Sequence, residues 1–199
     1  MKKFGGFEDA QKNARYTGGA KLPEGAYVAN IMNVKYVPGT DGNSDRIDIQ
    51  FDISEGEYKG FFKKQYEENT QEDKKWKGKT SIYVPKDDGS EKDEWTKNTF
   101  AKWTNALEDS NNKYKWDWDE NKWKGLSIGL MFALTGNVIE GKEVTYTEVR
   151  YPMSVENAKK PDVKIPAIKK RNGYTGSAPV PTDNSFVTVP DSVAEEIPF

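Results

Sequence analysis

The chain has 199 residues, of which 35% are hydrophobic and 31% are charged, and its formal net charge is −2. This length suits one ordinary domain with a tail, and so polar a chain is not expected to bury all of its length. The absence of Cys and His excludes disulfide scaffolds, thiolate metal sites, thiol nucleophiles and Ser–His pairs.

A Gly-rich arm at residues 1–20 is followed by three predicted strands joined by short turns. The first covers 26–37, where apolar residues occur in both phases of the alternation. The clearest strand covers 45–53, because Ile or Phe alternates there with charged or polar residues. Residues 58–66 predict a third strand, with Phe61 and Lys63 on one face and Phe62, Lys64 and Tyr66 on the other.

The next part of the chain predicts a connecting segment, a helix and two long strands. Residues 67–93 are charged and rich in turn residues, with one short strand at 82–84. Helical spacing follows at 93–109, with Asp93 as the expected N-cap. Its apolar face would consist of Thr96, Phe100, Trp103 and Leu107. The final strands are expected at 126–137 and 144–152, followed by a Lys- and Pro-rich stretch and a flexible tail.

Three strands, a helix and two further strands form the element order of the OB-fold, a small Greek-key barrel. Such barrels often bind oligonucleotides across their second and third strands. We therefore predict a mainly β protein with an OB-like DNA-binding domain at 21–155 and a helix over one barrel end. Residues 156–199 would form a basic, then disordered tail. Another small barrel or a β-sandwich is the alternative fold.

Aromatic residues make up 13% of the chain, and several lie beside Lys or Arg. Nonspecific binding of single-stranded DNA requires cations for the phosphates and flat rings for the bases. The predicted nucleic-acid-binding residues are Lys35, Tyr36, Arg46, Phe61, Phe62, Lys63, Lys64, Tyr66, Trp76 and Lys77. These rings serve equally well as core residues. Trp116 and Trp118, which alternate with aspartates, are expected instead to pack over a barrel end.

The chain ends in a short acidic and apolar tip formed by Glu195, Glu196, Ile197, Pro198 and Phe199. Pro198 fixes its own φ and biases Ile197 towards an extended conformation. Such a tip can place an apolar ring in a pocket while its carboxylates meet Arg or Lys at the rim. We predict that these five residues bind a protein partner.

The tip resembles the C-terminal tail of bacterial single-stranded-DNA-binding proteins, which recruits replication and repair partners. Residues 57–66, 83–90 and 100–107 resemble instead single-stranded-DNA-binding proteins of phages and mobile elements from Gram-positive bacteria. The resemblance implies nonspecific single-stranded-DNA binding and protection during phage or mobile-element replication or recombination. It also implies that the tip recruits replication or recombination proteins.

The sequence is also compatible with other functions. A replication or recombination accessory protein could act mainly through the tail. A carbohydrate-binding module also uses exposed Trp, but no secretory signal is seen, and no apolar run could span a bilayer. Asp41, Asp45, Asp87 and Asp88 could bind a hard metal ion in an enzyme, but no nucleophile and base converge. We therefore expect a cytoplasmic protein without catalysis, cofactor or metal, in which oligomer formation is possible.

Overall fold

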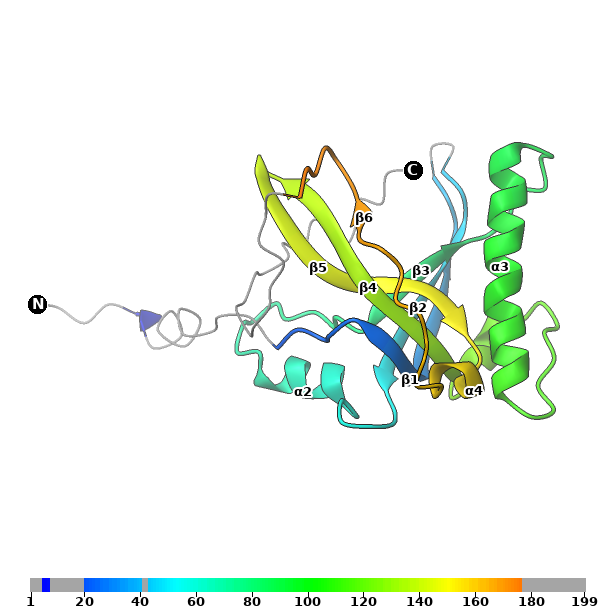
Figure 1. Cartoon of the computed structure of the whole chain (residues 1–199), viewed down its shortest axis with the longest axis horizontal. Helices are drawn as coiled ribbons and strands as arrows, with labels where there is room; N and C mark the ends of the chain where they lie inside the picture. The colour runs from blue at the N-terminus through cyan, green and yellow to red at the C-terminus, as the bar shows by residue number, and fades with distance from the viewer. Residues whose placement is uncertain (1–4, 8–19, 41–42, 177–199) are drawn as a thin grey trace, which may run out of the picture.

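The computed structural model describes residues 5–7, 20–40 and 43–176, which form mainly β-sheet with a few helices (Figure 1). The sheet contains six strands in the described residues. Five of them follow the order β3-β2-β1-β4-β5 through antiparallel pairs. Their bounds are β1 (Gly25–Val37), β2 (Arg46–Ile53), β3 (Lys79–Tyr83), β4 (Ser127–Ile139) and β5 (Lys142–Met153). The order makes β3 and β5 the edges of an open sheet, to which β6 (Lys169–Lys170) adds a parallel pair with β4.

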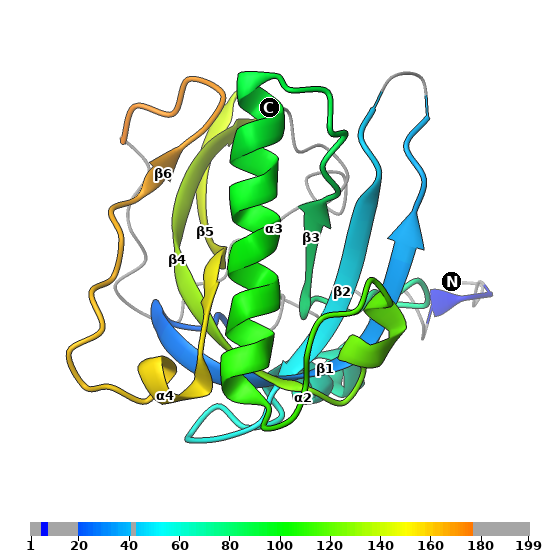
Figure 2. The ribbon, with the colours of Figure 1, turned by 90° about the vertical axis from the view of Figure 1, so that its right-hand side faces the viewer.

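Helix α3 (Glu91–Ser110) packs against β5, β4 and β3, and thus contacts both edge strands (Figure 2). Its predicted apolar face is confirmed, because Thr96, Phe100, Trp103 and Leu107 are all buried. The predicted N-cap is wrong by one turn. The cap is Ser90, whose side chain accepts a hydrogen bond of 3.1 Å from the backbone N–H of Asp93. None of the helices in the described ranges is long and apolar enough to cross a membrane.

The predicted strand at 58–66 is wrong, because this segment forms helix α2 (Phe61–Glu68). Lys63 and Lys64 each lie one helical turn before a glutamate, with both ion pairs at 3.9 Å. The carboxylate of Asp52 on β2 accepts hydrogen bonds from the backbone N–H groups of Phe62 and Lys63, at 2.9 and 3.2 Å. This tertiary cap satisfies donors that a free helix end would leave unpaired. The third strand is instead β3, which overlaps the short strand predicted at 82–84 within the connecting segment but begins three residues earlier.

Strand β1 carries a β-bulge that changes which residues face the core. The register with β2 shifts between Ile31 and Asn33. Ile31 and Val34 are consequently both buried in the core, whereas Met32 is 52% exposed. A regular strand would place Met32 and Val34 on the same face, and the bulge separates them by inserting one extra residue.

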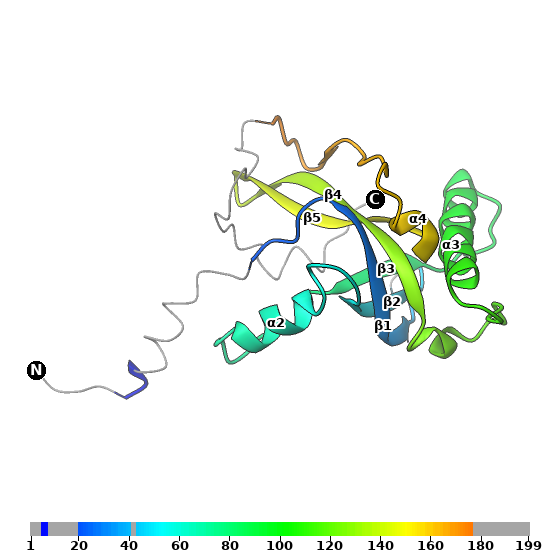
Figure 3. The same cartoon turned by 60° about the horizontal axis from the view of Figure 1, so that its bottom comes forward.

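The core continues from α2 to α3, which lie on different sides of the strands (Figure 3). Phe62 of α2 packs edge-on against Phe51 at a ring-centroid distance of 5.5 Å and stacks near Phe132 at 6.4 Å. Near α3, the short 3-10 helix η1 (Glu120–Trp123) buries Trp123 completely against the core. These contacts belong to one hydrophobic cluster, which joins β1, β2, β3 and β4 to both helices.

Trp116 and Trp118 differ in burial although they alternate in sequence. Trp116 is partly buried and packs against Phe100 at 5.7 Å, as the predicted structural role requires. Trp118 is 83% exposed and has a positive φ of 68°, so the prediction that it packs over a barrel end is wrong.

The beginning of the predicted basic tail packs against the sheet. Helix α4 (Val155–Ala158) lies on β4, where a Cβ on Gly129 would come within 2.7 Å of the Ala158 Cβ. Tyr174 is buried over Gly136, which likewise leaves no space for a side chain. The predicted flexible tail and its tip, residues 177–199, lie outside the described residues.

Candidate functional site

The strand register brings three rows of side chains onto the outward face of β1, β2 and β3. The inward phase of the same strands is apolar, because Ile47, Ile49 and Ile82 are buried. The outward phase contains only Val37 as an apolar residue. Its rows are Asn33–Gln50–Lys79, Lys35–Asp48–Ser81 and Val37–Arg46–Tyr83. We call these nine residues the three-strand face.

The three-strand face carries more positive than negative charge, although the chain as a whole has a net charge of −2. Lys35, Arg46 and Lys79 are exposed there. Asp48 is the only acidic residue in the three rows. Its Oδ1 accepts hydrogen bonds from Arg46 Nε at 2.9 Å and from Ser81 Oγ at 2.7 Å. One carboxylate thus partly neutralises one of three cations, and a positive surface remains beside the Tyr83 ring.

Two predicted site residues, Lys35 and Arg46, lie on this face, and a third, Tyr36, lies at its edge. Tyr36 pairs with Ile47 and so belongs to the inward phase, but its side chain is 41% exposed near the end of the strand. Its hydroxyl donates a hydrogen bond to Asp45, which raises the pKa of Tyr36 and lowers the pKa of Asp45. This bond ties the end of β1 to the start of β2.

The predicted residues Phe61 to Lys64 are not on the three-strand face, because they belong to α2. Phe62 is only 7% exposed and serves as a core residue. Phe61 is partly buried and packs against Phe62 at 5.1 Å. Lys63 and Lys64 are exposed, but each is paired with a glutamate of the same helix. This helix therefore presents less net positive charge than its lysines alone indicate.

A second group of predicted residues, Tyr66, Trp76 and Lys77, lies next to the start of β3. The rings of Tyr66 and Trp76 are tilted against each other at 5.9 Å, and Lys74 Nζ lies 4.6 Å from the centre of the Tyr66 ring. Trp76 Nε1 donates to the carbonyl of Gly78 at 2.9 Å. We call Tyr66, Lys74 and Trp76 the ring cluster; it fixes two aromatic rings and a cation just before Lys79.

Sequence reasoning missed Lys79 and Tyr83 because it placed the third strand elsewhere. Both belong to β3, and their outward position follows only from the pairing of β3 with β2. The alternation of Thr80 and Ile82 with Lys79, Ser81 and Tyr83 was an available signal for this strand. Lys74 was noted beside Trp76 in the sequence but was not among the predicted site residues, because its contact with the Tyr66 ring requires the fold.

The aspartates considered as metal ligands do not form a site in the described residues. Within these ranges, no group of three or more acidic side chains could hold a metal ion. Asp45 binds Tyr36 and the N–H of Gly39, and Asp87 pairs with Lys97 at 2.7 Å. Asp88 accepts a hydrogen bond from the backbone N–H of Ser90, and Asp41 lies outside the described residues.

The predicted partner-binding tip, Glu195 to Phe199, also lies outside the described residues. Comparison of the sequence with protein-family models found none that matches. A comparison with curated proteins found no similar sequence.

Proposed function

We propose that this protein binds single-stranded DNA without sequence preference along the three-strand face. The main support for this proposal is the strand register, which places Lys35, Arg46 and Lys79 on the same face as Tyr83. Phosphates would meet the cations, and an unpaired base would stack on the ring. Asn33, Gln50 and Ser81 supply neutral hydrogen-bonding groups between them, which suits contacts that do not depend on one base.

The arrangement of the strands supports the same proposal. The order β3-β2-β1-β4-β5, with α3 between β3 and β4 in the chain, is compatible with an OB-like barrel. In this proposal, α3 fills the space between the two edge strands, which it contacts. OB-folds often bind oligonucleotides across their second and third strands, where Arg46 and Lys79 lie here.

The ring cluster would extend the binding track beyond the sheet. Trp76 precedes Lys79 by three positions in the sequence, and its indole is held by the carbonyl of Gly78. A strand of DNA that follows β3 would pass from Tyr83 to Lys79 and then reach Trp76. Since the five residues of β3 span about 16 Å, this track accommodates only a few nucleotides.

The biological setting follows from the resemblance alone and is part of the proposal. The protein would protect single-stranded DNA during phage or mobile-element replication or recombination. The tip, Glu195 to Phe199, would recruit a replication or recombination protein.

Titration of the full chain with unlabelled oligo-dT, followed by intrinsic Trp fluorescence over a salt series, tests the binding proposal. We expect a saturable change that weakens with salt, with a log–log slope of about −0.7 for each phosphate neutralised. A folded protein that gives no change at low salt, and no shift in the anisotropy of a labelled oligo-dT, would overturn the proposal.

Replacing the proposed stacking ring tests the position of the site. Tyr83→Leu should weaken oligo-dT binding by about 10-fold, because a base–aromatic stack contributes about 1–3 kcal/mol. Trp118→Leu is the matched control, since Trp118 is exposed but is not part of the three rows. Equal losses in the two variants would contradict the proposed position of the site.

A further inference from the structure

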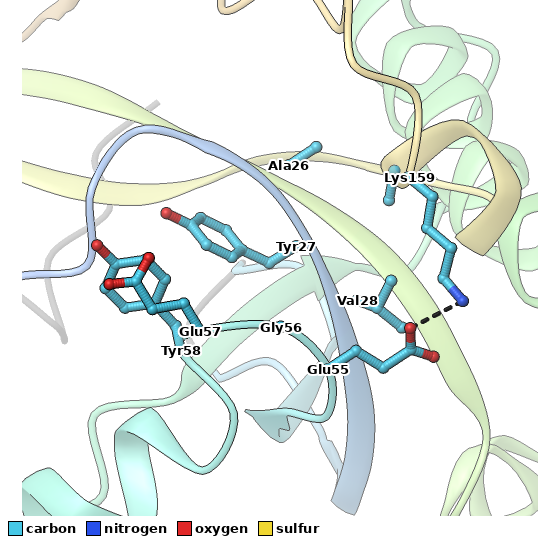
Figure 4. A pocket seen from close by; sticks show the side chains of 9 residues that line it. Ala26, Tyr27, Val28, Glu55, Gly56, Glu57, Tyr58 and Lys159 are labelled. Carbon is cyan, nitrogen blue, oxygen red and sulfur yellow. Dashed lines mark ion pairs between the residues drawn. The ribbon is translucent and has the colours of Figure 1, made fainter.

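A cavity of about 360 Å³ lies at the other end of β1, between this strand, the turn after β2 and helix α4 (Figure 4). Its wall includes the aromatic rings of Tyr27 and Tyr58, and its polar groups are Glu55, Glu57 and Lys159. Val28 of the cavity and Lys35 of the three-strand face are separated by about 20 Å along β1. The cavity is therefore distinct from the proposed DNA site.

The two tyrosines are held in place by their neighbours. Their rings meet edge to face at 5.6 Å and 85°, and Tyr27 packs in the same way against Phe132 at 5.6 Å. The Tyr27 hydroxyl donates to the carbonyl of Pro23 at 3.0 Å. Because Tyr27 is anchored at both its ring and its hydroxyl, the aromatic wall is formed without a ligand.

The carboxylates of the cavity differ in their partners. Glu55 pairs with Lys159 at 2.8 Å, on the side of the cavity formed by α4. Glu57 lies beside Tyr58 on the opposite side, with Tyr27 between the two carboxylates in the view of Figure 4. Glu57 forms no ion pair within the part of the chain that the structure describes. One negative charge at the aromatic wall is therefore uncompensated there.

The Tyr27 phenol is held neutral mainly by its burial. Burial raises the pKa of Tyr27 to about 12, and Tyr58 and Glu57 add to this increase. A group that disfavours ionisation of a phenol also disfavours the approach of phosphate. Because Glu57 has no ion pair in the described residues, its carboxylate makes this wall better suited to a cation than to the DNA backbone.

We propose that this cavity binds the guanidinium group of an arginine side chain from a partner protein. A planar guanidinium can lie against a tyrosine ring and form two parallel hydrogen bonds to the Glu57 carboxylate. The Glu55–Lys159 pair closes the opposite side and leaves Glu57 to the incoming cation. An ammonium group lacks the planar fork, so a lysine side chain fits less well.

The position of α4 determines the shape of this site. Ala158 is buried against Gly129, and this contact places the next residue, Lys159, at the cavity. The partner would consequently contact β1, the turn at residues 55–58 and α4 together. Since the cavity and the three-strand face are far apart, DNA and the partner could be bound at the same time.

NMR titration of the full chain with the blocked peptide acetyl-Gly-Arg-Gly-amide tests this proposal without nucleic acid. We expect saturable amide shifts at Tyr27, Gly56, Glu57 and Tyr58. The isosteric citrulline peptide, which has no charge, should cause none, and the lysine peptide should bind at least about threefold more weakly. Similar shifts with the citrulline peptide, or no shifts with the arginine peptide, would overturn the proposal.

Two variants separate recognition by Glu57 from a general charge effect. Glu57→Gln keeps the shape of the side chain and should weaken arginine-peptide binding by about 10-fold or more. Glu91→Gln removes the same charge from an exposed position on α3 and should leave binding unchanged. Equal losses in the two variants, or retained binding in Glu57→Gln, would show that Glu57 does not bind the guanidinium.

Discussion

The two ends of β1 present opposite chemistry to solvent. At the C-terminal end, the three-strand face gathers Lys35, Arg46 and Lys79 around one carboxylate. At the N-terminal end, the cavity carries two carboxylates, Glu55 and Glu57, and one lysine, Lys159, which pairs with Glu55. A net charge of −2 therefore conceals two surfaces of opposite sign. Net charge alone therefore does not identify a partner for this protein, because the sign of the charge differs from one strand face to another.

The largest effect is expected when two cations are removed from the three-strand face. Lys35→Ala/Lys79→Ala should weaken oligo-dT binding by roughly 10- to 100-fold and make the salt slope shallower by about 1.4. Labelled oligo-dT anisotropy over a salt series measures both quantities. Lys102→Ala/Lys124→Ala removes the same charge from exposed positions outside the face and should change neither. If the two double variants behave alike, the face has no special role.

A substitution at Gly129 should change the shape of the cavity and leave the three-strand face intact. A Cβ at this position would lie 2.7 Å from the Ala158 Cβ and 2.7 Å from the Ser154 carbonyl, so α4 must move. Gly129→Ala should lower the free energy of unfolding by about 1–3 kcal/mol, as measured by urea denaturation. It should also weaken binding of the arginine peptide while oligo-dT binding stays within about twofold.

A second change checks the cause of this loss. Ala158→Gly in the Gly129→Ala background removes the clash with the Ala158 Cβ, one of three close contacts, and should restore part of the stability. No restoration would mean that the contact with Ala158 does not limit the position of α4.

A smaller effect, in the opposite direction, is expected at Asp48. Its carboxylate holds Arg46 Nε at 2.9 Å and repels phosphate. Asp48→Asn keeps an oxygen acceptor for Ser81 but removes the charge, so oligo-dT should bind roughly two- to fivefold more tightly at low salt. Asp109→Asn, an exposed change on α3, is the control. Weaker binding in Asp48→Asn would indicate that Arg46 requires its ion pair in order to contact DNA.

The smallest effect is expected in the pH dependence of stability, and it comes from the phenol of Tyr27 in the cavity. The pKa of Tyr27 is raised from 10.0 to about 12, so folding favours the neutral phenol. This contribution to stability is fully present below pH 10 and is lost as the pH rises through about 12. Urea denaturation of wild type and Tyr27→Phe should therefore converge in this pH range. A constant difference between the two proteins from pH 8 to 12 would contradict the assigned cause.

Much of the sheet could be predicted from local patterns. The alternation from Ile47 to Ile53 predicted β2 to within one residue, because one face of this strand is buried and the other is at least partly exposed to solvent. The spacing of Phe100, Trp103 and Leu107 gave α3 for the same kind of reason. Local periodicity is reliable where one side of an element meets a single core.

In the segments that were mispredicted, contacts between residues far apart in the sequence determine the conformation. The helix at Phe61 begins beneath the Asp52 carboxylate, a tertiary contact that the local sequence does not reveal. The spacing of Lys63 and Lys64 before glutamates was the local signal for a helix. The bulge at Met32 likewise depends on how β1 pairs with β2.

The candidate sites show the same limit. Lys35 and Arg46 were predicted from residue type, but their grouping with Lys79 and Tyr83 requires the strand register. The cavity combines residues from β1, the turn after β2 and the segment after β5. No spacing in the sequence indicates that Glu57 and Lys159 belong to one site.

Amide NMR mapping of the full chain with unlabelled oligo-dT is the strongest test of whether the three-strand face binds DNA. We predict that shifts concentrate at Lys35, Arg46, Lys79 and Tyr83 and extend to Trp76, while Gly56 and Glu57 remain unchanged. Shifts centred on the cavity or on α4, or no shifts at low salt with a folded protein, would contradict the assignment of the three-strand face as the DNA-binding site.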